Sequence, residues 1–146
     1  MERSLEHLRE YLEEFVALVE AGKSVEAMQR FYAEDVLLFE NRELARAGRE
    51  RCVEFEREQL GKQPEPPRCR AGKLAADPAT GVCFIEWVIH FQSNSGRPMR
   101  LEEVAVQKWS SAGIIEERFY YEGLIDVGDD VADEDQDARA AVQFDA

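Results

Sequence analysis

The chain has 146 residues, 45% of them hydrophobic and 34% charged, and this composition is typical of one globular domain with a single hydrophobic core. Its net charge of -13 would repel phosphate backbones and anionic lipid, so we expect neither a nucleic acid nor a membrane as partner. The first residues are charged and no run of 18 apolar residues occurs, which favours a cytoplasmic protein without a signal peptide.

Acidic residues are concentrated at the C-terminal end of the chain. Residues 126–146 hold eight Asp and Glu residues against Arg139 alone, so seven of the thirteen net negative charges lie there. Such a run is typical of a solvated, mobile tail, and a partner-binding tail is the alternative. We therefore predict a folded pocket domain at residues 1–125 and a mobile acidic tail at residues 126–146.

The N-terminal half predicts three helices and one short strand. Apolar residues recur at helical spacing over residues 5–19, before a stop at Gly22, and again over residues 24–32. The apolar run 36–39 fits a short buried strand. A third helical pattern follows over residues 48–61, and the prolines after it forbid its continuation.

The second half predicts an antiparallel meander. Turn signals at 77–81, 93–96 and 110–113 separate four strand-like runs that begin at Arg68. The order of elements predicts an α+β fold, in which three N-terminal helices pack on one face of a mostly antiparallel sheet.

Cysteine and histidine are too few and too scattered for a metal or redox centre. Cys52, Cys69 and Cys83 are far apart in sequence and are expected to be buried as small hydrophobic residues. His7 and His90 are the only histidines, so no metal site is predicted. The sequence has no phosphate-binding glycine-rich loop, and we expect no cofactor.

Three short segments carry a resemblance to a known family. They are the run 31–36, the run 48–50 before the third helix, and the closing runs 113–115 and 119–122. With the order of elements, they resemble the nuclear transport factor 2-like superfamily, above all its polyketide-cyclase-like and ketosteroid-isomerase-like branches. This resemblance implies a cone-shaped fold whose curved sheet encloses a central pocket. Members include isomerases, cyclases, dehydratases and proteins without catalysis, so the chemistry has to be argued from the site residues.

The ketosteroid isomerases offer a specific pattern for comparison, with a carboxylate base and two oxyanion donors. The resemblance places the base on Glu40, whereas the two donor positions fall on Phe15 and Ala105, which cannot donate. A steroid-isomerase mechanism in that form is therefore not expected. The polyketide cyclases keep an acid near the end of the last long strand, and Glu122 resembles it.

The strand 83–92 alternates cleanly between an apolar face with Trp87 and a second face with Glu86 and His90. Two interpretations stay open. In the first, Trp87 faces the core and His90 faces solvent, which is the ordinary pattern of a half-buried strand. In the second, which follows the family resemblance, Glu86 and His90 point into the cone.

The second interpretation predicts a polar cavity around Glu40 and His90 as candidate acid-base residues. The expected binding residues of this cavity are Tyr32, Glu86, Glu103, Arg118, Tyr120 and Glu122, with Gln107 and Glu56 beside them. Tyr32 has the alternative of a plain core residue, and Glu56 that of a surface residue. Clustered ionisable groups are typical both of active sites and of structural ion-pair networks.

Our leading hypothesis is a small-molecule pocket protein, with cofactor-independent proton transfer of the isomerase, cyclase or dehydratase type. A non-catalytic ligand-binding or dimeric assembly domain is the alternative. If His90 faces the cone, an apolar outer sheet face predicts a homodimer through that face. This face would comprise Ile85, Trp87, Ile89, Phe91, Val104, Val106, Phe119 and Tyr121.

Overall fold

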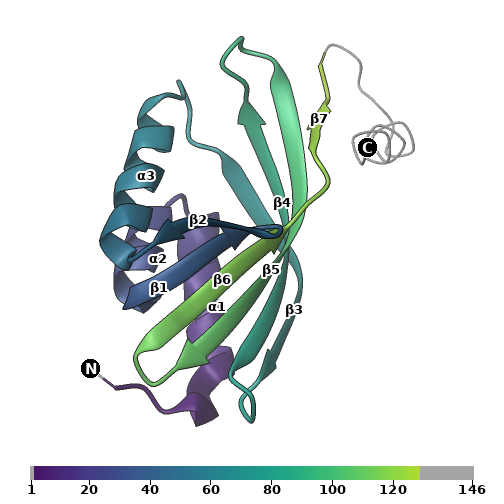
Figure 1. Ribbon diagram of the computed structural model, residues 1–146. Helices are drawn as coiled ribbons and strands as arrows, with labels where there is room; N and C mark the ends of the chain where they lie inside the picture. Colours follow the sequence, from purple (N-terminus) through teal and green to yellow (C-terminus); the bar gives the residue numbers. More distant parts are fainter. Residues whose placement is uncertain (1, 129–146) are drawn as a thin grey trace.

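The computed structural model describes residues 2–128 (Figure 1). Its helices are a short 3-10 turn at Leu5–His7, followed by α1 at Leu8–Glu20, α2 at Ser24–Phe31 and α3 at Arg49–Gly61. Its strands are β1 at Tyr32–Glu40, β2 at Glu43–Ala47, β3 at Arg68–Asp77, β4 at Val82–Gln92, β5 at Pro98–Ser110, β6 at Gly113–Tyr120 and β7 at Leu124–Asp126.

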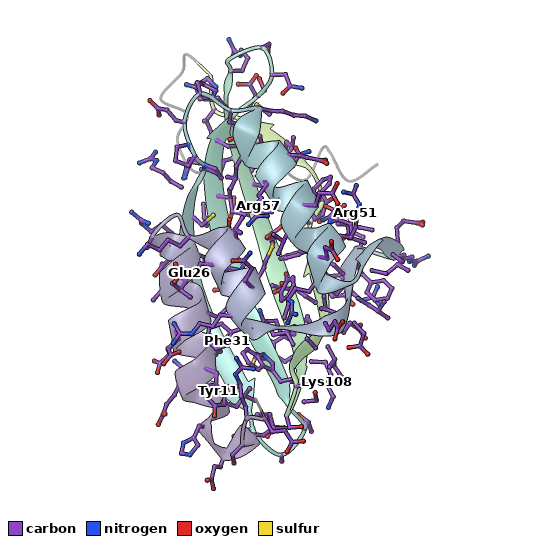
Figure 2. The ribbon with its side chains drawn as sticks, turned by 90° about the vertical axis from the view of Figure 1, so that its left-hand side faces the viewer. Tyr11, Glu26, Phe31, Arg51, Arg57 and Lys108 are labelled. Atoms are coloured by element: carbon purple, nitrogen blue, oxygen red, sulfur yellow. The ribbon has the colours of Figure 1, made fainter. Side chains whose placement is uncertain are left out.

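The strands form one curved sheet in the order β2-β1-β6-β5-β4-β3, and β7 pairs with β5. Strands β1 and β6 run parallel, and the other pairs are antiparallel. Figures 1 and 2 show the three helices covering the concave face of this sheet, which does not close into a barrel. The predicted α+β fold class is confirmed.

The helices dock because each carries one apolar stripe. In α1, Leu8, Leu12, Phe15 and Val16 recur at helical spacing and are all buried. Polar residues occupy the other sides of the helices: Figure 2 shows Glu26 and Arg51 on the surface of the helical layer. The concave face of the sheet is therefore the core face, and any cavity within the fold must lie between it and the helices.

Three strands, β1, β2 and β7, differ from the sequence-based prediction. β1 begins directly at Tyr32, so this residue lies on a strand and not on the second helix. β2 was not predicted; Asn41, at a positive φ of 53°, turns the chain so that Glu40 pairs with Glu43. β7 has only three residues, too few for a pattern.

The faces of β4 are the reverse of those that the family resemblance predicted. Cys83, Ile85 and Trp87 are buried against the helices, and Trp87 is only 4% exposed. Phe84 and Glu86 are exposed on the outer face, which His90 shares by the alternation of the strand. The expectation that Glu86 and His90 point into the cone is therefore wrong, and the expected outward orientation of Ile85 and Trp87 is wrong with it.

The last strand, β7, ends at Asp126, next to the predicted boundary between domain and tail. Ile125 is buried, and the Asp126 carboxylate accepts hydrogen bonds from Arg97 at 3.1 and 3.2 Å. Residues 129–146, which hold most of the predicted acidic tail, lie outside the described residues. No helix within residues 2–128 is long and apolar enough to span a membrane.

Candidate functional site

A cavity of about 180 Å³ lies between the helices and the concave face of the sheet. The helices contribute apolar side chains such as Phe15 and Met28, and β4 contributes Trp87. Polar groups enter from five elements: Tyr32 of β1, Arg46 of β2, Glu56 of α3, Glu103 of β5 and Glu117 of β6. The cavity therefore combines aromatic walls with several ionisable side chains.

Glu117 is the most deeply buried ionisable group in this cavity, at 1% exposure. The Tyr32 hydroxyl donates a short hydrogen bond to its Oε1, and Gln107 Nε2 donates to its Oε2 at 2.7 Å. Trp109 Nε1 in turn donates to Gln107 Oε1 at 2.9 Å. Because the indole can only donate, it fixes the orientation of the Gln107 amide, whose nitrogen must then face Glu117.

Aromatic packing holds this hydrogen-bonded chain in place. The Tyr32 ring stacks on Phe15 of α1, with centroids 6.4 Å apart and an interplanar angle of 18°. Trp109 stacks on Tyr11 of α1 at 6.1 Å and meets Phe31 of α2 edge-on at 5.7 Å. The helices thus position Trp109 and Tyr32, the two ends of this series of hydrogen bonds. Burial raises the pKa of Glu117, although both of its hydrogen bonds oppose that rise.

Glu103 faces the same cavity from the neighbouring strand. Burial raises its pKa to about 8, and the nearby carboxyls of Glu117 and Glu40 add to the rise. Tyr121 interacts with both Glu103 and Glu40: burial, Glu40 and Glu103 together raise the pKa of its phenol. A carboxyl with a pKa near neutrality can both donate and accept a proton at physiological pH.

Two charged groups line the helical side of the cavity. The Arg46 guanidinium lies 3.7 Å from the centroid of the Phe55 ring, over its face. Glu56 accepts a hydrogen bond from the Ser24 hydroxyl at 2.6 Å. These contacts join β2, α2 and α3 around the cavity.

The structure brings together three of the eight residues predicted for the site. Tyr32 and Glu103 line the cavity, and Glu40 lies close enough to Glu103 to raise its pKa. Glu56 and Gln107, which were predicted beside them, also belong to this region: Glu56 lines the cavity, and Gln107 is fully buried against Glu117.

The other five predicted residues lie on or near the outer side of the sheet. Arg118 packs its guanidinium over Phe39 and donates to the Asn41 carbonyl oxygen at 2.6 Å. Glu86, Tyr120 and Glu122 line an open groove of about 720 Å³ on this side. His90 lies near the end of β4, opposite Arg68 of β3 and Arg100 of β5 in the sheet register.

The sequence-based prediction missed Glu117, which is central to the site. The turn at 110–113 alone would pair Gln107 with Glu116. A bulge at Ile115 shifts the register by one, so Gln107 pairs with Glu117. The available signal was the doublet Glu116-Glu117 inside a strand, but nothing in the sequence marks which of the two faces inward.

The cysteines do not add chemistry to the site. Cys52 and Cys83 are buried, and Cys69 is half-buried at the cavity wall. Burial raises the pKa of both Cys69 and Cys83 to about 12, so these thiols stay protonated and weakly reactive. Within residues 2–128, no three His, Cys, Asp or Glu side chains converge in a metal-binding arrangement.

Comparison with known proteins identifies the fold. No protein-family model matches the sequence, and no curated protein matches it either. A nuclear transport factor 2-like protein of unknown function from Burkholderia xenovorans is 18% identical over 80% of this chain and 84% of its own, with a TM-score of 0.61.

Two further structures are similar. The epoxide hydrolase/cyclase-like enzyme SalBIII, which takes part in pyran ring formation in salinomycin, is 14% identical over 77% of this chain and 88% of its own, with a TM-score of 0.64. A protein with a ketosteroid isomerase-like fold from Catenulispora acidiphila, in complex with trimethylamine, is 17% identical over 77% and 85%, with a TM-score of 0.62. The chain thus has the nuclear transport factor 2-like fold.

Proposed function

We propose that the cavity binds a small molecule and transfers a proton to or from it without a cofactor. The observation that carries this proposal is the buried chain Trp109–Gln107–Glu117–Tyr32, which opens into a cavity that also contains Glu103. Such a series of buried hydrogen bonds is costly to bury. One of its members, Glu117, lies near the Glu103 carboxyl, whose pKa is about 8. An acid-base site explains both features.

The size of the cavity limits the substrate. A cavity of roughly 150 Å³ holds one benzene molecule, and the present cavity measures about 180 Å³. A single six-membered ring with small substituents fits this volume, whereas a fused tetracycle does not. The substrate class is therefore small, and reactions on steroid-sized molecules are not proposed.

In the proposed reaction, the Glu103 carboxylate removes a proton from a carbon next to a carbonyl group, and negative charge develops on the carbonyl oxygen. Tyr32 stabilises this charge by a hydrogen bond. When Glu117 is protonated, it donates to the Tyr32 oxygen, and the phenolic hydrogen is free to turn into the cavity. The raised pKa of Glu117 favours this protonated state.

Glu40 is the competing candidate for the base, because the family resemblance places the base there. Glu40 is half-buried beside Glu103, whereas Glu103 lines the cavity itself. We therefore assign proton removal to Glu103 and assign to Glu40 the role of raising the Glu103 pKa by charge repulsion.

Hydrogen-deuterium exchange tests this assignment without knowledge of the net reaction. The protein is incubated in deuterated buffer with a panel of small ketones such as cyclohexanone, and loss of the signals of the protons next to the carbonyl is followed by NMR. We expect catalysed exchange for at least one ketone, and Glu103→Gln should lower the exchange rate by ~10²–10⁴-fold. Glu40→Gln should retain exchange and shift its pH profile to lower pH.

Glu102→Gln is the matched control, since Glu102 is the adjacent residue on the opposite, exposed face of β5. Its exchange rate should equal that of the wild type. Exchange that is abolished by Glu40→Gln and retained by Glu103→Gln would move the base to Glu40. Binding of ketones in the cavity without exchange would exclude proton transfer and leave a binding protein.

One observation favours a second role, in assembly. Most of the large hydrophobic side chains that are exposed within residues 2–128 lie on strands at positions that alternation puts on the outer face of the sheet: Leu37, Leu44, Phe84, Val104 and Tyr120. An apolar face of this extent favours association, and we propose a homodimer through it.

A further inference from the structure

Four aromatic side chains and three carboxyl groups line the cavity. Phe15, Tyr32, Trp87 and Phe119 supply aromatic rings from one helix and three strands. Glu56, Glu103 and Glu117 line the same space, against Arg46 as the one cation among the lining residues of residues 2–128. The lining thus carries more carboxyl groups than cationic groups.

Arg46 does not neutralise the inner carboxyls. Its guanidinium is held over the Phe55 ring at 3.7 Å. A neighbouring guanidinium would lower the pKa of Glu103 or Glu117. Instead, the pKa of Glu103 is raised by burial, Glu117 and Glu40, and that of Glu117 is raised by burial against the hydrogen bonds of Tyr32 and Gln107. Neither carboxyl has a cationic partner among these causes.

We infer that the ligand of this cavity is a small organic cation, an ammonium group on a body no larger than about one six-membered ring. The inference deepens the proposed function, since it rests on the cavity as the ligand site and names the charge of what enters. An ammonium group lies favourably on aromatic faces, Trp above all, and it compensates a carboxylate that is costly to bury alone. A neutral ligand can pack on the rings, but it leaves the negative charge of an ionised carboxylate uncompensated.

The whole molecule supports the same sign of charge. The net charge of -13 attracts cations and raises their local concentration. A bare metal ion is a poorer match, because the structure gathers no three His, Cys, Asp or Glu ligands within residues 2–128 and because four aromatic side chains form part of the cavity wall.

Choline and 3,3-dimethylbutan-1-ol are the probes, since they have nearly the same shape and differ in the positive nitrogen. Affinity is measured by calorimetry or by NMR titration of the Trp87 indole signals. We expect choline to bind at least tenfold more tightly at pH 8. Tetrapropylammonium, which has the same charge and a larger body, should not enter. Equal affinity for choline and the neutral alcohol would overturn the inference.

Binding should also depend on pH, because Glu103 must ionise to meet the cation. The other ionisable groups around it are Glu117 of β6, Glu40 of β1, Cys69 of β3, Tyr121 after β6, and Tyr32, Arg46 and Glu56 at the cavity wall. With the Glu103 pKa at about 8, choline affinity should rise by up to about tenfold per pH unit below pH 8 and level off above it.

Glu103→Gln should weaken choline binding and flatten this pH dependence, whereas Glu102→Gln should change neither. A steep pH dependence that survives in Glu103→Gln would show that another group carries the effect. Choline contains no carbonyl group, so its binding is independent of the exchange experiment. Choline binding without ketone exchange would overturn the proton-transfer function alone, and exchange of neutral ketones without choline preference would overturn the cation inference alone.

Discussion

At the scale of single residues, the site depends on two glutamates that reach one cavity from neighbouring strands. Glu117 is fully enclosed and held by Tyr32 and Gln107, whereas Glu103 has the cavity in front of it. Each carboxyl makes ionisation of the other more costly, since two like charges in a medium of low polarity repel strongly. We therefore expect the protonation state of this pair to affect stability and, under the proposed function, proton transfer.

Glu103 should make the folded state less stable as the pH rises. Its pKa is about 8 when folded and about 4.3 in an unfolded chain. The folded state therefore holds the proton more tightly, and its contribution to stability is complete below about pH 4 and is lost as the pH rises to 8. Because glutamine cannot ionise, Glu103→Gln removes this loss. Between pH 5 and pH 8 its free energy of unfolding should increase by about 2–4 kcal/mol relative to that of the wild type.

Urea denaturation at unit steps from pH 5 to pH 9 measures this difference. The gain should grow through the window and stay constant above pH 9, and Glu102→Gln should follow the wild type throughout. Parallel curves for wild type and Glu103→Gln would mean that Glu103 titrates normally. In that case the assignment of Glu103 as the base loses its physical basis.

Tyr32→Phe should destabilise the protein by removing one of the two donors to Glu117. A buried acceptor that loses its partner costs about 1–3 kcal/mol, and the remaining partner is Gln107. Urea denaturation at pH 7 measures the loss. Tyr120→Phe is the control, because Tyr120 is 51% exposed and its change should stay within about 0.5 kcal/mol. Equal effects of the two variants would remove the Tyr32–Glu117 bond as a stabilising contact.

At the scale of elements, the sequence predicts which segments are helices and which are strands better than it predicts which face each strand presents. The three helices and the long strands were identified from hydrophobic spacing and turn residues. Alternation in β4 was equally clear, but alternation alone does not say which face is inside. The family register placed both Glu86 and Glu103 in the cone. In the structure Glu103 pairs with Trp87, so Glu86 must lie on the opposite face.

Register is also the reason why part of the site could be predicted and part could not. Glu40 was found from the position that the family resemblance gives to the base, and Glu103 from the inferred strand face. Tyr32 was assigned to the site as a helix residue, although it lies on β1. Glu117 was missed because its inward direction depends on a one-residue bulge at Ile115, which is invisible in hydrophobic spacing. Packing of Trp109 and Tyr32 against α1, which fixes the chain of hydrogen bonds, joins residues far apart in the sequence.

A pair of alanine variants in β4 tests the observed faces. Trp87→Ala should cost about 3–5 kcal/mol, because it opens a cavity in the core at a side chain that is 4% exposed. Phe84→Ala, at a side chain that is 47% exposed, should cost less than about 1 kcal/mol in dilute protein, where association contributes least. Denaturant unfolding measures both. A larger cost at Phe84 would restore the family-based orientation of the strand.

At the scale of the whole molecule, the two sides of the sheet have different tasks. The concave side is covered by helices and contains the cavity (Figure 1). The outer side has no covering layer within residues 2–128, although it carries the exposed apolar side chains of Phe84, Val104 and Tyr120. A homodimer was predicted through this side with Ile85 and Trp87 among its residues, but both lie in the core.

The proposed dimer therefore still forms through the outer side of the sheet, but most of the residues that form the interface differ from those predicted. Phe84 of β4, Val104 of β5 and Tyr120 of β6 lie on three consecutive strands of the sheet and are 47%, 38% and 51% exposed. Two copies related by a two-fold axis bury the same face against each other, which closes the assembly and leaves neither face wet. The cavity opens on the other side of the sheet, so the site remains accessible in such a dimer.

Phe84→Arg should break this dimer while the fold is retained, because it places a charge at the centre of the apolar face and leaves the core intact. Size-exclusion chromatography with light scattering should give twice the monomer mass for the wild type and the monomer mass for the variant. Ala17→Arg is the control: it adds the same charge on the exposed side of α1 and should remain dimeric. A monomeric wild type would exclude the dimer, and the exposed residues of the outer face would then need another partner. Trp87→Arg cannot serve as the test, since a charge at that position unfolds the core whether or not the chain dimerises.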